Sequence, residues 1–169
     1  MSYPPLCDPI PGVAPDAFGA AAEQIRNFCN WHVAPVVTET VTFDGTGSAL
    51  LMLKSLRVTA VGEVLVNGSA VTDYTWSKGG YLWRSAGWGG CNYPDGYLLG
   101  SITVTFTHGY ETCPAELRAV LQLMSTQGMQ TAPVSVQVGN VRVQQSPAQT
   151  AGVLGTDAFV STLNRYRVV

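Results

Sequence analysis

Three residues near the middle of the chain are close enough in sequence to suggest a metal site: His108, Glu111 and Cys113. Histidine, carboxylate and thiolate groups are the usual ligands of zinc. The spacing of these three matches none of the standard zinc motifs, and a single histidine at the end of a strand more often has a structural role. We therefore expect no metal and no cofactor in this protein.

The other residue types that support catalysis do not occur in catalytic patterns. No serine has the Gly-x-Ser-x-Gly spacing of a nucleophile elbow. Gly45-Thr46-Gly47 lacks the later glycine and the lysine of a phosphate-binding loop. No two of the eleven acidic residues share a helix face or strand in a way that suggests a carboxylate pair, although such a pair formed only in space stays open. The sequence predicts a protein that is not an enzyme.

The cysteines are spaced too far apart to form a Cys-x-x-Cys metal or redox motif; they are Cys7, Cys29, Cys91 and Cys113. In a reducing compartment we expect four free thiols, and two disulfides in a secreted protein is the alternative. Cys29 and Cys113 lie in helical contexts, so we expect them to pack as small apolar groups.

A glycine-rich stretch carries many of the aromatic residues: Tyr74, Trp76, Tyr81, Trp83, Trp88, Tyr93 and Tyr97. These side chains could fill the core of a β block that has few aliphatic residues. They could also anchor a contact between subunits, where Tyr and Trp are enriched. Exposed aromatic rings could instead stack on sugar rings, so a glycan-binding β module is the alternative function.

The composition limits the partners that this chain can have. Charged residues make up 12% of the 169 residues, about half the usual share, and the formal net charge is −2. The nine Lys and Arg are scattered, which argues against tight nucleic-acid binding. A surface with so few charges is typical of a protein covered by other subunits, or simply of a β protein rich in Thr and Gly.

No segment predicts contact with a membrane. The longest apolar run, Ala49 to Leu53, is far too short to span a bilayer. The first residues lack the charged start and apolar run of a signal peptide, so we expect the product to stay in the cytoplasm where it is made.

The elements that position these residues follow from periodicity and turn residues. Five prolines within 1–15 predict an extended N-terminal arm. Asp16 can cap a helix that ends before Pro35 and places Glu23 and Arg26 on its polar side, opposite the apolar stripe. The region 36–107 is β in pattern, and Asn67-Gly68 within it predicts a hairpin turn.

The second half of the chain contains the clearest local signals. Ile102, Val104 and Phe106 alternate with polar residues in a strand at 101–107, and a helix at 114–127 carries Leu117, Val120, Leu121 and Met124 on one stripe. Valines alternate in a second hairpin at 134–144, and Thr156 can cap a last helix. The predicted fold class is α+β. We expect residues 1–169 to be a single domain, a small three-helix bundle with an antiparallel β block, residues 36–107, inserted between helices 1 and 2. The hairpin lies between helices 2 and 3.

Several segments in this order resemble one family. They are Thr103 to Tyr110, Pro114 to Arg118, the aromatic block, the valine-rich segment ending at Val138-Gly139, and Leu163 to Arg167. In this combination the chain is similar to the head-to-tail connector (adaptor) proteins of tailed bacteriophages, in the form common among actinobacteriophages.

The resemblance implies a structural virion protein of the phage neck, assembled in the host cytoplasm. It implies a homo-oligomeric ring, expected to be dodecameric, that binds below the portal protein, joins head to tail and extends the DNA channel. It also implies a stopper or tail-terminator protein as a second partner and transient, non-specific contact with passing DNA. The residues assigned by resemblance to portal docking are Phe159, Leu163, Arg165, Tyr166 and Arg167. For Phe159 and Leu163 the alternative is that the last helix only closes its own bundle.

Two further surfaces follow from this interpretation. The hairpin is the candidate for a channel-facing or tail-facing loop because its polar face carries a single charge; its residues are Ser135, Gln137, Gly139, Asn140, Arg142 and Gln144. Ring closure needs two different faces on each subunit. The stripe of the helix at 114–127 can serve the subunit's own core, so a second apolar surface must come from the β block or from the arm. The residues expected at the subunit interface are Tyr3, Leu6, Ile10, Trp83 and Trp88. Removal of residues 1–14 is expected to weaken assembly and leave the monomer folded.

Overall fold

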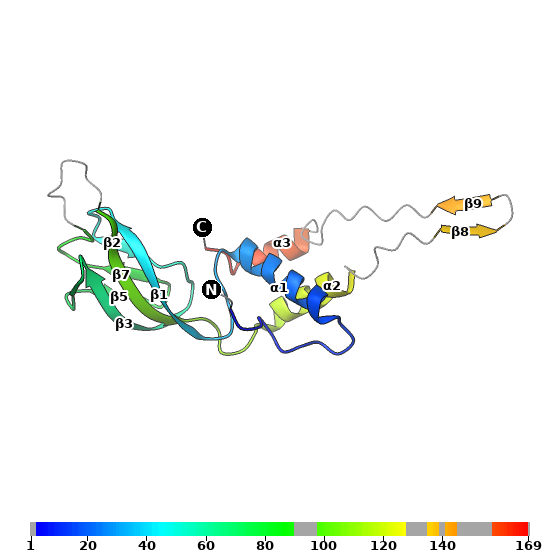
Figure 1. Ribbon diagram of the computed structural model, residues 1–169, viewed down its shortest axis with the longest axis horizontal. Coiled ribbons are helices and arrows are strands. Elements are labelled where there is room, and N and C mark those ends of the chain that lie inside the picture. Colours follow the sequence, from blue (N-terminus) through cyan, green and yellow to red (C-terminus); the bar gives the residue numbers. More distant parts are fainter. Residues whose placement is uncertain (1–2, 90–97, 128–134, 139–140, 145–156, 169) are drawn as a thin grey trace.

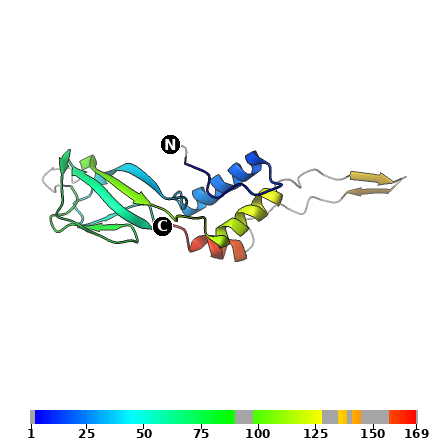
Figure 2. The same ribbon diagram turned by 90° about the horizontal axis from the view of Figure 1, so that it is seen from below.

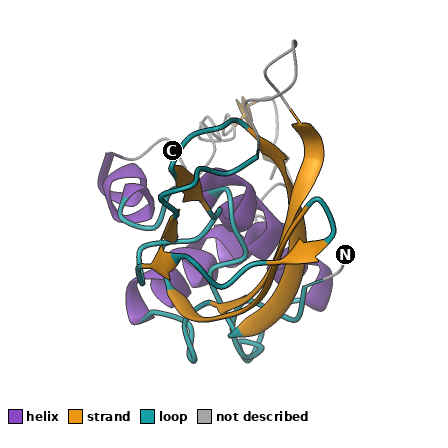
Figure 3. Cartoon of the chain, turned by 90° about the vertical axis from the view of Figure 1, so that its left-hand side faces the viewer, coloured by secondary structure: helices purple, strands orange, loops and turns teal. Residues whose placement is uncertain are grey.

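The chain places its sheets and its helices in separate regions. The computed structural model describes residues 3–89, 98–127, 135–138, 141–144 and 157–168. Two packed sheets lie at one end, three short helices lie in the middle, and a hairpin lies at the other end (Figure 1). Viewed along the long axis, the sheets lie in front of the helices (Figure 3).

The larger sheet has four antiparallel strands in the order β1-β7-β3-β4. These strands are β1 (Val37–Gly45), β7 (Leu98–His108), β3 (Val58–Val66) and β4 (Ser69–Ala70). The predicted alternation in β7 is confirmed, because Ile102, Val104 and Phe106 are buried. The opposite face carries threonine pairs, with Thr38 and Thr107 hydroxyls 2.8 Å apart and those of Thr40 and Thr105 also 2.8 Å apart.

The predicted turn at Asn67-Gly68 is confirmed. It joins β3 to β4, and both residues have positive φ, 52° for Asn67 and 77° for Gly68. Asn and Gly tolerate this left-handed conformation, which two-residue hairpin turns of this kind require.

A smaller antiparallel sheet packs on the first. It has the order β2-β6-β5, from β2 (Leu50–Met52), β6 (Tyr81–Trp83) and β5 (Thr75–Trp76). The core between the sheets consists of one set of buried residues: Leu53, Val58, Val64, Leu82, Trp88, Ile102, Val104 and Phe106. Trp88 is fully buried in it, and its indole Nε1 donates a hydrogen bond to the Leu82 carbonyl at 3.2 Å.

Three helices form the middle of the molecule: α1 (Pro15–Cys29), α2 (Ala115–Gln127) and α3 (Asp157–Asn164). They contact one another, as Figure 2 shows from below. α1 begins at Pro15, and Ala14 occupies the N-cap without a side-chain bond, so Asp16 is not the cap but lies in the first turn. The stripe predicted on α2 is confirmed, because all four of its apolar residues are buried. None of the helices in the described ranges is long and apolar enough to cross a membrane.

The prediction of a small three-helix bundle with an inserted β block is wrong. The molecule is a mixed α and β structure in which two antiparallel sheets supply seven strands and the helices are short, α3 having only 8 residues. The helices do not form a core by themselves. Non-helical residues complete it: Leu6 and Cys7 from the arm, Trp31, Val33 and Ala34 from the α1–β1 connection, and Val168 after α3.

The expectation of four free thiols is also wrong. Cys7 in the arm and Cys113 just before α2 form a disulfide that spans 106 residues of sequence. Cys29 is a buried free thiol, as expected for a small apolar group, and Cys91 lies outside the described residues. The pairing is invisible in the sequence, because it depends on the arm folding back over the helices.

Loss of this disulfide should lower the stability of the protein. A cross-link over a loop of this length restricts the unfolded chain, so we expect Cys7→Ser/Cys113→Ser to lower the free energy of unfolding by about 2–4 kcal/mol. Denaturant titration under non-reducing conditions measures this, and the wild type titrated under reducing conditions should lose a similar amount. An unchanged midpoint for the double variant would contradict the prediction.

The predicted second hairpin is confirmed as β8 (Ser135–Val138) and β9 (Val141–Gln144). Its register pairs Val136 with Val143 and Gln137 with Arg142. The two strands lie clear of the helices at the end of the molecule away from the sheets (Figures 1 and 2).

Candidate functional site

A cluster of titratable side chains joins the sheets to the helices. We call it the junction cluster: Tyr3, His32, Glu39 and His108. The Tyr3 hydroxyl donates to Glu39 Oε2 at 2.9 Å, and His108 Nε2 lies 3.0 Å from Glu39 Oε1. The two histidine rings are in edge contact, with their centroids 4.3 Å apart.

Burial has the largest effect on His32. Together with the neighbouring His108, it lowers the pKa of His32 to about 4. Nδ1 of each histidine is buried without a hydrogen-bond partner among the described residues. The His108 imidazole, 3.0 Å from the carboxylate, is the main cause that lowers the pKa of Glu39. His32 is therefore neutral and Glu39 ionised near neutral pH.

These shifts predict loss of stability in mild acid. An unfolded histidine takes up a proton near pH 6.5, whereas folded His32 does so only near pH 4. The unfolded chain thus binds more protons between these values, so stability is complete above pH 6.5 and falls by up to about 3 kcal/mol as the pH drops toward 4. Glu39 adds to the loss at lower pH. Unfolding of the wild type and of His32→Gln from pH 7.5 to 4.5 measures the effect. Equal pH dependence in the two proteins would argue against it.

The structure does not assemble His108, Glu111 and Cys113 into one site. His108 faces Glu39, Cys113 is bonded to Cys7, and Glu111 is exposed. Among the described residues there is no group of three or more His, Cys, Asp or Glu that could hold a metal ion.

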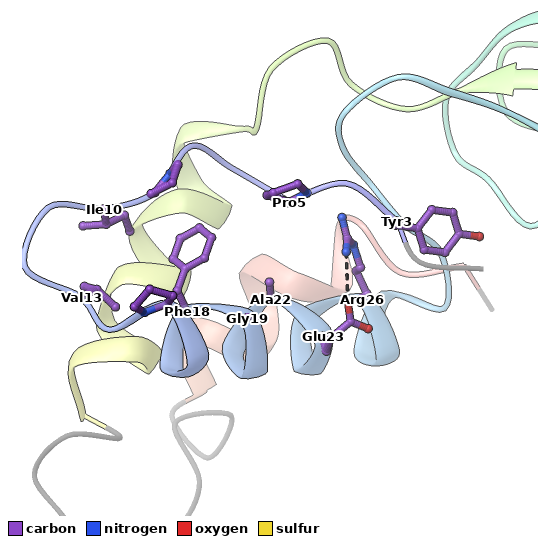
Figure 4. A pocket seen from close by; sticks show the side chains of 11 residues that line it. Tyr3, Pro5, Ile10, Val13, Phe18, Gly19, Ala22, Glu23 and Arg26 are labelled. Atoms are coloured by element: carbon purple, nitrogen blue, oxygen red, sulfur yellow. Dashed lines mark hydrogen bonds and ion pairs between the residues drawn. The ribbon is translucent and has the colours of Figure 1, made fainter.

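The N-terminal arm arches over α1 and leaves a groove of about 410 Å³ between them, which we call the arm groove (Figure 4). Its lining is mainly apolar: Pro5, Pro9, Ile10 and Val13 from the arm, and Pro15, Phe18, Gly19 and Ala22 from α1. Tyr3 and the Glu23–Arg26 ion pair close one end. Phe18 and Ala22 rise from the helix toward the arm in Figure 4.

Arg26 holds the arm to the helix. Its guanidinium donates to the carbonyl oxygens of His32 and Ala34, each at 3.2 Å, and to that of Pro4. It also pairs with Glu23 at 3.0 Å. The sequence pattern placed Arg26 on the polar side of its helix, yet the side chain is only 6% exposed, because the arm covers it.

The second unusual surface is the outer face of the smaller sheet. Two cross-strand pairs form it, Leu50 with Trp83 and Met52 with Tyr81, and we call these four residues the small-sheet face. All four are 44–50% exposed. Contiguous exposed apolar side chains of this kind usually mark a contact surface.

The five residues predicted at the subunit interface have different environments. Leu6 and Trp88 are buried in the two cores, whereas Trp83 is 50% exposed. Tyr3 and Ile10 line the arm groove. Because Leu6 and Cys7 complete the helical core, we now expect deletion of residues 1–14 to destabilise the monomer instead of leaving it folded.

The C-terminal residues predicted to dock on a portal are only partly exposed. Leu163 is fully buried, and Phe159 and Tyr166 pack against the helical core. The Tyr166 carbonyl accepts a hydrogen bond from Trp31 Nε1 at 2.6 Å. Arg165 is 72% exposed and lies 3.4 Å from Glu116, while the Arg167 guanidinium lies 5.4 Å from the Phe28 ring centroid.

The hairpin residues are placed in part. Ser135 and Gln137 are on β8, and Arg142 and Gln144 are on β9. Gly139 and Asn140, predicted at its turn, lie outside the described residues.

Comparison with known proteins gives a match at the level of structure only. No protein-family model matches this sequence, and no curated protein matches it. A chain in the neck of the native GTA particle, computed with C12 symmetry, matches with a TM-score of 0.55 at 12% sequence identity, covering 91% of this chain and 81% of that one. This chain shares the fold of that neck chain.

Two other structures give the same result. A chain in the neck of the empty GTA particle, computed with C6 symmetry, has a TM-score of 0.55 at 11% identity, over 91% of this chain and 77% of that one. A chain in the virion of the native gene transfer agent (GTA) particle has a TM-score of 0.54 at 14% identity, over 91% and 76%. The likeness therefore extends over nearly the whole chain.

Proposed function

We propose that this chain is a structural protein of the neck of a phage-like particle, where it joins head to tail without catalytic activity. The observation that carries the proposal is the likeness over 91% of the chain to a chain of the GTA neck. The resemblance of the sequence to the adaptors of actinobacteriophages, in segments such as Thr103 to Tyr110 and Pro114 to Arg118, favours the same role.

Symmetry and composition favour a ring. The GTA necks that contain the matching chains have C12 and C6 symmetry. We extend this to a dodecameric ring of the present chain that binds below a portal protein, contacts a stopper or tail-terminator protein and continues the DNA channel. A chain with only 12% charged residues suits extensive contact with its own copies.

The portal contact is assigned to the C-terminal segment. Arg165 offers an exposed charge, and Arg167 and the half-buried Tyr166 lie beside it. Phe159 and Leu163 pack in the helical core and thereby hold this segment in place. A portal surface that binds here would carry carboxylates.

The hairpin is assigned to the channel or to the tail side. Its register pairs Ser135 with Gln144 and Gln137 with Arg142. Arg142 is the one charged residue among these four. DNA that passes such a wall would make transient contacts without the strong phosphate binding that slows movement.

Glycan binding is the weaker alternative. The exposed Trp76, Tyr81 and Trp83 are the observation that favours it. However, the small-sheet face pairs its aromatic residues with Leu50 and Met52, whereas a sugar site needs polar groups that bind hydroxyls. Binding to a glycan array, lost in Trp83→Ala, would favour this alternative.

Disruption of the gene for this chain in its source genome tests the proposal. We expect filled or leaking heads without tails, and free tails, in electron micrographs. Complementation with the wild-type gene should restore tailed particles, with the chain located at the neck by cryo-electron microscopy. Tailed, infectious particles that lack the chain would contradict the proposal.

A further inference from the structure

The arm groove is a concave apolar surface that the described part of its own chain leaves open. Its floor has a small residue, Gly19, at which an added Cβ would meet no atom within 4 Å. Ile10, Val13 and Phe18 form its walls. The groove has a volume of about 410 Å³, which is large enough for at least one apolar side chain of a partner. The groove therefore has the size and chemistry to receive a large side chain.

Whereas the arm groove is concave, the small-sheet face presents exposed side chains that a groove could receive. Trp83 and Tyr81 stand on the outer face of a sheet, next to Leu50 and Met52, and each is at least 44% exposed. Aromatic anchors of this kind contribute most of the binding energy when they enter a pocket on a partner.

The charges around the two surfaces are complementary. Exposed Asp8 and Asp16 adjoin the lining residues Pro9 and Pro15 and make the groove margin acidic, whereas Glu23 in the lining is already paired with Arg26. Exposed Lys54 and Lys78 lie beyond the Met52–Tyr81 end of the small-sheet face. Backbone hydrogen bonds from Leu53 to Gly80 and from Val58 to Lys78 keep these two lysine-bearing segments at the same end.

We propose that the small-sheet face of one copy docks into the arm groove of the next copy. This contact joins two different surfaces, so it is heterologous and can close a ring. The acidic groove margin meets the lysines, and the aromatic rings enter the apolar groove. The inference rests on the proposed function, because it identifies the two faces that build the ring.

Two variants each remove one half of the contact. Gly19→Trp fills the groove on a helix that tolerates the change, because glycine is a poor helix former. Trp83→Ser removes the central ring of the small-sheet face. Their controls are Ala20→Trp, an exposed neighbour on α1 that does not line the groove, and Leu123→Ser on α2, which is 41% exposed and away from the face. Circular dichroism and unfolding midpoints establish that all four variants are folded.

Sedimentation velocity of the full chain, up to about 1 mM, gives the result. We expect the wild type and both controls to self-associate, and each contact variant to associate at least tenfold more weakly. A mixture of Gly19→Trp and Trp83→Ser should form a dimer and nothing larger, because the first retains its face and the second retains its groove. A wild type that stays monomeric over this range, contact variants that associate like wild type, or a mixture that stays monomeric would each overturn the inference.

The same variants separate this inference from the proposed function. If both complement the gene disruption and show normal tails, the neck role stands and this contact is wrong. If the contact is confirmed in solution but tails attach without the chain, the neck role fails and the contact stands. If Gly19→Trp abolishes binding of a portal protein but leaves self-association unchanged, the groove receives a different partner and the inference is overturned.

Discussion

Replacing Trp88 with alanine should lower the free energy of unfolding by about 3–5 kcal/mol. The side chain is 0% exposed between the two sheets, with the Tyr74 ring centroid 6.2 Å away. Its removal leaves a cavity that both sheets line and takes away the indole hydrogen bond to the Leu82 carbonyl.

The surrounding backbone cannot collapse into this cavity easily. The glycines on either side of Trp88 have φ of 77° and 83°. A Cβ on Gly87 would lie 2.7 Å from the Gly47 oxygen, and one on Gly89 would lie 2.6 Å from the Gly45 Cα. This segment is therefore already in close contact with the end of β1, so we expect the cavity to remain largely open.

Denaturant titration at low protein concentration measures the effect. Trp88→Phe should cost less than the alanine variant because it keeps much of the buried ring. Trp83→Ala is the matched control, because its side chain is 50% exposed and its loss should cost less than about 1 kcal/mol in the monomer. Equal losses for the two tryptophans would mean that Trp88 does not have the central role assigned to it.

Replacing Arg26 with methionine should lower stability by about 2–5 kcal/mol. Methionine fills a similar apolar volume but donates no hydrogen bond, so the Ala34 carbonyl loses its bond from Arg26 and the His32 carbonyl keeps only its bond from the Ala34 amide. The Pro4 carbonyl is released as well, which should free the arm from α1.

Two measurements distinguish this from a general loss of stability. Hydrogen exchange should rise in the arm, residues 3–14, more than in β7, because the hydrogen bonds of Arg26 go to the arm, to the α1–β1 connection and to Glu23 of its own helix. Arg26→Lys should be intermediate, since one ammonium group cannot reach all the acceptors of a guanidinium. Glu23→Gln is the control, and because this pair is partly exposed its loss should cost less than about 1 kcal/mol. Arm exchange that is unchanged in Arg26→Met would contradict the assignment.

Elements with a strong local signal were predictable. The alternation in β7, the stripe on α2 and the Asn67-Gly68 turn each depend on neighbours in sequence, and the structure contains all three. The positions predicted to be buried in β7 and α2 are buried in the structure, because a single buried face gives the sequence its period.

The aromatic block shows where such reasoning stops. Trp88 and Trp83 occur in similar glycine-rich surroundings, and the sequence left core, subunit interface and sugar contact open for both. In the fold Trp88 fills the core, while Trp83 is on the outer face of β6. The two tryptophans differ because the larger sheet covers one face of this region and leaves the other face exposed. Strands of two or three residues are too short for their periodicity to indicate which face is covered.

By itself, the sequence determined the helices, the strands and turns with a strong local pattern, and a surface with few charges, because these depend on local spacing and on composition. Only the tertiary structure decided the two-sheet architecture, the disulfide from Cys7 to Cys113, the burial of Arg26 and the groove under the arm. Each of these is a contact between segments far apart in the chain, since Cys7 and Cys113 are separated by 106 residues and Arg26 bonds to Pro4 across 22. The arm covers a face of α1 that the periodicity of this helix predicts to be exposed. No local sequence pattern encodes which face a distant segment will cover.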